Sequence, residues 1–155
     1  MSDQFVEMGV TLISINFMEN NREMPVPPGK SFTELEVWKK ARHLKNKIKR
    51  ITQNFPAEEK FRLTDQIIRS SRSINANIAE GHGRFTYPDQ IHFCIQARGS
   101  LSETYNHCID AYDESIINKE LLKELKEEIN ECERLLNGYI NWLRKELAKT
   151  KESRK

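Results

Sequence analysis

The sequence contains few residues that interrupt helices. Six glycines and five prolines occur among its 155 residues, and three of the prolines fall within residues 25–28. This scarcity excludes collagen-like and other low-complexity chains, which are rich in both residues. Apolar residues make up 37% of the chain and recur at regular intervals. The sequence therefore predicts one folded domain built from long helices.

Long apolar segments are also missing. No apolar run approaches the roughly 18 residues that a membrane-spanning helix requires. The best candidate, residues 10–17, is too short, and Asp3 and Glu7 precede it where a secretory signal would carry basic residues. We therefore expect no membrane span, no secretory signal and a cytoplasmic location.

Cysteine is scarce, and its placement excludes two common uses. Cys94, Cys108 and Cys132 are odd in number and widely spaced, which matches neither a disulfide framework nor a zinc-binding pattern. We expect three buried, reduced thiols.

Signatures of catalysis are missing as well. The sequence has no glycine-rich phosphate loop, no nucleophile elbow and no Ser–His–Asp order. His92 and His107 stand too close to Cys94 and Cys108 in sequence to share a helical face with them as metal ligands. We predict a binding or assembly protein, with no enzymatic activity, metal or cofactor.

The net charge of +2 conceals two segments of opposite charge. Residues 30–53 carry eight lysines and arginines against two glutamates, a net charge of +6. Residues 110–133 carry nine acids against three lysines, a net charge of −6. Such polarity concerns partners and assembly rather than fold.

Two amphipathic helices are predicted after residue 30. The first begins at residue 32 or 34, with Ser31 or Thr33 as its cap, and ends at residue 53, before Pro56. Its inner residues, spaced 4, 3, 4 and 3, are Val37, Ala41, Leu44, Ile48 and Ile51. The second begins at residue 56 or 57 and is expected to end where Gly81 and Gly83 adopt a left-handed conformation. Its predicted inner residues are Phe61, Ile67, Ser71, Ile74 and Ile78.

Two further helices are predicted in the second half of the chain. The third follows residues 87–89 and runs to about residue 112, and Gly99 in its middle predicts tight packing at that point. Its predicted inner residues are Ile91, Ile95, Leu101 or Ser102, Tyr105, Ile109 and Tyr112. The fourth runs from about residue 118 to 147 with a regular heptad pattern, which suits a bundle core or a subunit interface. The heptad residues are Leu122, Leu125, Ile129, Cys132, Leu136, Tyr139 and Leu143.

Four amphipathic helices joined by short connections predict an all-α fold, an antiparallel up-down-up-down four-helix bundle. We assign the bundle to residues 31–149. Residues 1–30 are expected to form a non-bundle arm with a Pro-rich linker, and residues 150–155 a basic tail.

Several segments resemble a known bacterial family. These are FTELEVWKKA at 32–41, Phe55-Pro56, DQIIRSSRSINANIAEGHGR at 65–84 and GSLSE at 99–103. Together they resemble the bacterial four-helix bundle proteins encoded in intervening sequences of ribosomal RNA genes. They are also similar to the accessory variability determinants of diversity-generating retroelements. The resemblance covers about residues 32–145, and Asn75 stands where many relatives have Pro.

The resemblance has implications for assembly and partners. It implies a homopentamer, and for the retroelement relatives a basic surface that binds nucleic acid and a reverse transcriptase. It supports the fold and the oligomer more strongly than any activity.

The basic residues of the first two helices form the main candidate site. They lie off the apolar stripe and could contact RNA or DNA phosphates, with binding that depends on salt but not on sequence. The alternative is a protein-only scaffold in which charged faces drive ring assembly, with the acidic fourth helix of the same or an adjacent subunit as the partner. The candidate nucleic-acid-binding residues are Lys39, Lys40, Arg42, Lys45, Lys47, Lys49, Arg50, Arg69 and Arg72.

The family-matching polar residues form a second candidate. We interpret them first as a structural motif, a network of caps and hydrogen bonds that fastens the turn after the second helix to the third. The alternative is a pocket or a catalytic acid. The motif residues are Asn77, Glu80, Gly81, Gly83, Arg84 and Glu103.

Overall fold

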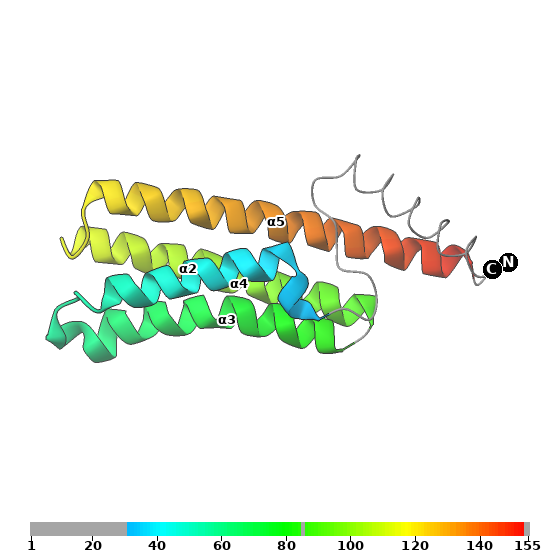
Figure 1. The fold of residues 1–155 in the computed structure, drawn as a ribbon, viewed down its shortest axis with the longest axis horizontal. Helices are drawn as coiled ribbons and strands as arrows, with labels where there is room; N and C mark the ends of the chain where they lie inside the picture. Colours follow the sequence, from blue (N-terminus) through cyan, green and yellow to red (C-terminus); the bar gives the residue numbers. More distant parts are fainter. Residues whose placement is uncertain (1–30, 85, 154–155) are drawn as a thin grey trace, which may run out of the picture.

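The computed structural model describes residues 31–84 and 86–153. The predicted N-terminal arm therefore lies outside the described residues. Four α-helices make up the described part: α2 (Glu36–Thr52), α3 (Asp65–Gly83), α4 (Tyr87–Asp113) and α5 (Lys119–Glu152). They pack as neighbours in the order α2, α3, α4, α5, and α2 also contacts α5 (Figure 1). This arrangement confirms the all-α four-helix bundle.

The helix beginning at residue 36 is preceded by a short 3-10 turn, η1 (Phe32–Glu34). Ser31, one of the two predicted caps, accepts a hydrogen bond from the backbone N–H of Thr33 at 3.2 Å. Leu35 separates the turn from α2 and is buried, because the backbone there is extended and directs its side chain into the core. The predicted start at residue 32 or 34 therefore corresponds to η1 rather than to α2.

The connection from α2 to α3 contains two irregular helical turns. They are a 3-10 turn, η2 (Ala57–Glu59), and a π turn, η3 (Lys60–Thr64). The prediction that Phe61 is an inner residue was wrong, because its side chain is 82% exposed. Phe61 is six residues before Ile67, which places the two on different sides of a helix. Leu63, four residues before Ile67, is buried instead.

The core face of α4 differs from the predicted one. Ile95 and Tyr112 were predicted to point inward, but they are 38% and 39% exposed. The buried stripe is spaced 3, 4, 3, 4 and 3 and consists mostly of small side chains, which bring α4 close to α3. Its members are Cys94, Ala97, Leu101, Thr104, Cys108 and Ala111.

Glycine has a different role from the predicted one at each of two positions. Gly81 is buried inside α3, and a Cβ atom there would lie 2.8 Å from the Cβ of Phe93 on α4. The helix does not end at a left-handed glycine, since it continues through Gly83 and Arg84 is right-handed. Gly99 faces open space, so the tight packing predicted there was wrong. The close approach of α3 and α4 occurs at Gly81.

The longest helix, α5, follows its predicted heptad pattern. Leu125, Leu136 and Leu143 are almost completely buried, and Leu122 is partly buried. The helix extends to Glu152, beyond the predicted end at residue 147, and its C-terminal part projects past the other helices (Figure 1). Each helix in the described ranges is too short or too polar to cross a membrane.

Candidate nucleic-acid interface

The seven cations of α2 lie on two separate stripes rather than on one face. Residues three or four apart share one side of a helix. Arg42, Lys45 and Lys49 continue from Trp38 at spacings of 4, 3 and 4. Lys40, Lys47 and Arg50 belong to a second stripe, which starts at Glu36, passes through His43 and includes Lys39 at its edge. The structure therefore divides the predicted basic face into two flanks with different neighbours.

The second stripe faces α5, and Lys47 is its most buried cation. The Lys47 side chain is 12% exposed, and its Nζ hydrogen-bonds the carboxylates of Glu124 and Glu128 on α5. Burial acts to lower the pKa of Lys47. The hydrogen bonds and negative charges of Glu124 and Glu128 outweigh burial and raise that pKa above its ordinary value. Lys47 is thus a contact between α2 and α5, not a cation available to phosphates.

Glu36, Lys39, Lys40 and His43 of this flank border a groove of about 770 Å³ between α2 and α5. Charges of both signs line it: Lys39 pairs with Glu36 at 2.7 Å, and Arg134 pairs with Glu131 at 2.9 Å. His43 Nε2 lies 3.7 Å from Glu128 Oε2, and that carboxylate oxygen is buried without a hydrogen-bond partner among the described residues. Lys39 and Lys47 of this flank are thus paired with carboxylates, whereas no ion pair of Lys40 or Arg50 is recorded within the described ranges.

The first stripe lies toward α3. Trp38 packs against Phe32, with ring centroids 5.3 Å apart, and Phe32 packs against His82 of α3. Four residues along α2, the Arg42 guanidinium lies 6.0 Å from the centroid of the Trp38 ring. Lys45 is half-buried and Lys49 is exposed. The structure records no ion pair with a carboxylate for these three cations within residues 31–84 and 86–153.

Arg72 of α3 joins this stripe. Asn75 donates from Nδ2 to the carbonyl oxygen of Trp38 at 3.0 Å, so its side of α3 faces α2. Arg72 is three residues before Asn75 and therefore lies toward the same side, where it is exposed and has no recorded ion pair in the described ranges. We call Arg42, Lys45, Lys49 and Arg72 the α2/α3 basic surface.

Arg69 lies toward α4, whereas Arg72 lies toward α2. The Arg69 guanidinium lies 3.5 Å from Asp65, and it lines a hollow between α3 and α4 together with Glu103. Residues 69 and 72 are still neighbours on the exposed side of α3, because they are three apart. The hollow therefore adjoins the α2/α3 basic surface.

Comparison with known proteins agrees with this architecture. A family model described as 23S rRNA-intervening sequence protein matches residues 33–138, more than half of the chain. The chain belongs to this family. It is also similar to a solved structure of unknown function from Bacteroides thetaiotaomicron VPI-5482, assigned to the S23 ribosomal protein family, with 25% identity and a TM-score of 0.63. That match covers 68% of this chain and 95% of the other. No curated protein matches the sequence.

The six motif residues do not form one network. Arg84 pairs with Glu80 at 2.6 Å within the end of α3, and its guanidinium also lies 5.3 Å from the ring centroid of Phe93 on α4. Asn77 instead donates to the backbone carbonyl of Ser73 at 2.8 Å. Glu103 lies on α4, where it is next to His107 and has no recorded bond to the other motif residues within the described ranges. Arg84 is thus the motif residue that fastens the end of α3 to α4.

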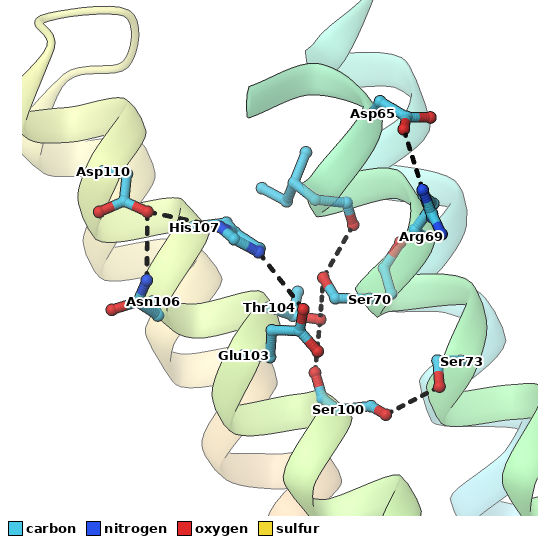
Figure 2. A network of polar contacts seen from close by, with 12 residues as sticks. Asp65, Arg69, Ser70, Ser73, Ser100, Glu103, Thr104, Asn106, His107 and Asp110 are labelled. Atoms are coloured by element: carbon cyan, nitrogen blue, oxygen red, sulfur yellow. Dashed lines mark hydrogen bonds and ion pairs between the residues drawn. The ribbon is translucent and has the colours of Figure 1, made fainter. Parts of the chain in front are cut away.

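A chain of hydroxyl groups joins α3 and α4. Thr104 Oγ1 lies 2.9 Å from Ser70 Oγ, and Ser73 Oγ lies 2.8 Å from Ser100 Oγ (Figure 2). Thr104 and Ser70 are buried, and the hydrogen bonds satisfy their polar atoms. The serines among the small residues at 70–79 predict hydrogen bonds across to a neighbouring helix, and Ser100 and Thr104 on α4 are the partners.

The buried cysteines agree with the predicted thiols. Cys94, Cys108 and Cys132 are free and buried, and burial raises the pKa of each thiol from 9.0 to about 12. Thiols with such pKa values are poor nucleophiles and poor metal ligands at neutral pH. Among the described residues, no group of three or more His, Cys, Asp and Glu side chains is arranged to hold a metal ion.

Proposed function

We propose that this protein is a non-enzymatic adaptor that binds RNA through the α2/α3 basic surface. One observation carries the proposal: Arg42, Lys45, Lys49 and Arg72 lie on two adjacent helices without carboxylate partners in the described part of the chain. On the α5 flank, by contrast, two of the four cations, Lys39 and Lys47, are paired with carboxylates. The family description, which names 23S ribosomal RNA, supports RNA as the ligand.

The chemistry of this surface suits a phosphate backbone. Arginine can donate two parallel hydrogen bonds to a phosphate, whereas lysine acts as a point charge, so the surface would bind without strong sequence preference. Each neutralised phosphate releases counterions, and affinity should therefore fall steeply as salt rises. DNA presents the same backbone charge and is the comparison ligand.

Assembly and protein partners belong to the same proposal. We propose that the protein acts in the cytoplasm as a homo-oligomer, with the homopentamer of the resembled proteins as the first assembly to test. A reverse transcriptase partner is a hypothesis that rests on the resemblance to retroelement proteins alone. The competing function is a protein-only scaffold in which the basic and acidic faces join different copies. The contacts of Lys47 weaken the scaffold hypothesis, because Lys47 is paired with Glu124 and Glu128 on α5 of the same chain.

The test measures binding and mass on the same preparation. A structured fragment of 23S ribosomal RNA and a DNA duplex of equal length are titrated by fluorescence anisotropy over a salt series, with light scattering at each salt concentration. The proposal predicts RNA binding that weakens with salt while the molecular mass stays constant. No binding at low salt, together with a mass that falls as salt rises, would support the scaffold instead.

A further inference from the structure

A polar hollow of about 350 Å³ lies between α3 and α4, beside the α2/α3 basic surface. Figure 2 shows Glu103 between the two helices, next to the hydroxyl chain that joins them. The lining residues are Gln66, Arg69, Ser70, Ser73 and Glu103. The sequence did not predict this hollow, although the alternative role considered for the motif residues, which include Glu103, was a pocket.

The hydroxyl groups of the wall are already used within the protein. Ser70 donates to the carbonyl of Ile67 at 3.2 Å and is a neighbour of Thr104, while Ser73 is bonded to Ser100. These bonds fix the two helices against each other and give the hollow a rigid floor. Ligand recognition is therefore left to the longer side chains at the rim.

The rim residues keep most of their hydrogen-bonding capacity. No hydrogen bond of the Gln66 side chain is recorded within the described ranges, and Arg69 has only the 3.5 Å contact with Asp65. Glu103 Oε1 lies 3.6 Å from His107 Nε2, a nitrogen that is itself buried and has no hydrogen-bond partner in the described part of the chain. Both separations exceed the usual 2.7–3.2 Å of a hydrogen bond. The Arg69 guanidinium and the Glu103 carboxylate thus face the same hollow, and each makes only long contacts inside the protein.

We infer that this hollow binds an unpaired guanine base of RNA, an inference that rests on the proposed RNA-binding function. Guanine carries two acceptors, O6 and N7, which suit the paired donors of Arg69. It also carries N–H donors at N1 and N2, which suit the acceptor-only carboxylate of Glu103. Adenine offers an amino group where guanine offers O6, so it would place a donor against Arg69.

The position and size of the hollow agree with this ligand. Proteins read RNA sequence mainly at unpaired bases that can be turned out of a stack and hydrogen-bonded at their edges. Phosphates held by Arg72 would lie close to Arg69, because residues 69 and 72 are three apart on the same exposed side of α3. The volume lies near the lower end of the range of about 300–1,000 Å³ typical of small-ligand pockets. The α2/α3 basic surface would supply affinity and the hollow would supply base preference.

The test uses four RNA hairpins that are identical except for one loop nucleotide, which is G, A, C or U. Their affinities for the full-length protein are measured by fluorescence anisotropy at one salt concentration. Wild type should prefer the G hairpin over the others by about tenfold. Glu103→Gln and Arg69→Lys should each reduce this preference to about twofold or less, because glutamine adds a donor at the carboxylate position and lysine loses the paired donors. Glu127→Gln and Arg144→Lys on exposed parts of α5 are the matched controls and should retain the preference.

The outcomes separate this inference from the proposed function. Equal, salt-dependent affinity of wild type for all four hairpins would overturn the guanine site and leave the RNA-binding function intact. No affinity for any hairpin at low salt would overturn both. If Glu103→Gln and Arg69→Lys changed the oligomeric mass in light scattering but not the base preference, the hollow would be a contact between copies and the inference would fail. Circular dichroism of both variants should match wild type, since neither residue is in the core.

Discussion

Asn75 of α3 donates a hydrogen bond to the carbonyl oxygen of Trp38 on α2 at 3.0 Å. This side chain is 8% exposed, and its bond sets which part of α3 lies beside which part of α2. Arg72, three residues before Asn75, accordingly lies toward the stripe of Arg42 and Lys45. A proline, which many resembled relatives have at this position, could not donate such a bond.

Replacement of Lys47 should weaken folding rather than RNA binding. Lys47→Met leaves Glu128, which is 16% exposed, without its main partner. We expect a loss of about 2 kcal/mol in unfolding free energy, less than the 3–5 typical of a fully buried pair because Glu124 remains half-exposed. Urea denaturation measures this loss, and Lys49→Met is the matched control with a change below about 0.5 kcal/mol.

The effect of Lys47 should also depend on pH. Because the folded-state pKa of Lys47 is raised above 10.5, its contribution to stability is complete below pH 10.5 and disappears as pH rises through the higher folded value. Denaturation of wild type and Lys47→Met at pH 7 and in the alkaline range tests this. The difference between the two proteins should narrow only in the alkaline range, and a constant difference would contradict the assigned ion pair.

Two glycines offer a matched test of helix packing. Gly81→Ala places a Cβ 2.8 Å from the Cβ of Phe93, so α3 and α4 must move apart, and we expect a loss of about 1–3 kcal/mol. Gly99→Ala meets open space inside α4, and alanine should stabilise that helix by about 0.5–1 kcal/mol. Thermal unfolding of both variants checks the prediction. Equal effects of the two substitutions on stability would contradict the close approach of α3 and α4 at Gly81.

Ser115 is a site where stability can be gained. It has φ 58°, the one left-handed non-glycine residue in the described ranges, and follows the end of α4. Ile116 donates to the carbonyl of Ala111 at 2.8 Å, the bond expected when a helix ends in this conformation. Ser115→Gly should remove backbone strain and raise the unfolding free energy by about 0.5–1 kcal/mol. A lower denaturation midpoint would show that the serine side chain stabilises this turn.

The three thiols should report on unfolding. Their pKa values of about 12 mean that few thiolates form in the folded protein at pH 9, whereas unfolded cysteines ionise near that pH. Iodoacetamide at pH 9 should therefore label the native chain only at the rate of its opening, and all three cysteines in denaturant. The same shifts predict that stability falls as pH rises above 9.0, because only the unfolded state releases these protons. Rapid labelling of the native protein would contradict the burial of the thiols.

The sequence predicts large apolar residues well and small or polar contacts poorly. The inner stripes of α2 and α5, which include Leu44 and Leu136, follow from the helical spacing of large apolar residues, because such residues must be removed from water. The core face of α4 could not be found in this way, since Thr104 and Ala97 give a weaker apolar signal than the exposed Ile95. The π turn that accompanies the outward position of Phe61 has no periodic signature either.

The candidate site shows the same limit. Composition identified the cations of α2, and their spacing of 3 and 4 could have divided them into two stripes. The pairing of Lys47 could not be read from the sequence, because Glu124 and Glu128 are 77 and 81 residues away from Lys47 along the chain. Only the packing of α5 against α2 shows that Lys47 is an internal partner.

The most direct test of the account is the salt dependence of RNA affinity in two triple variants. Arg42→Gln/Lys45→Gln/Arg72→Gln removes charge from the α2/α3 basic surface, and Lys39→Gln/Lys40→Gln/Arg50→Gln removes the same charge from the α5 flank while leaving Lys47 intact. Each lost phosphate contact should lower the slope of log affinity against log salt by about 0.7–0.9. We predict a decrease of about 2 in the first variant and little change in the second, with both proteins folded. Equal slopes in the two variants, or a larger decrease in the second, would contradict the α2/α3 basic surface as the RNA-binding site.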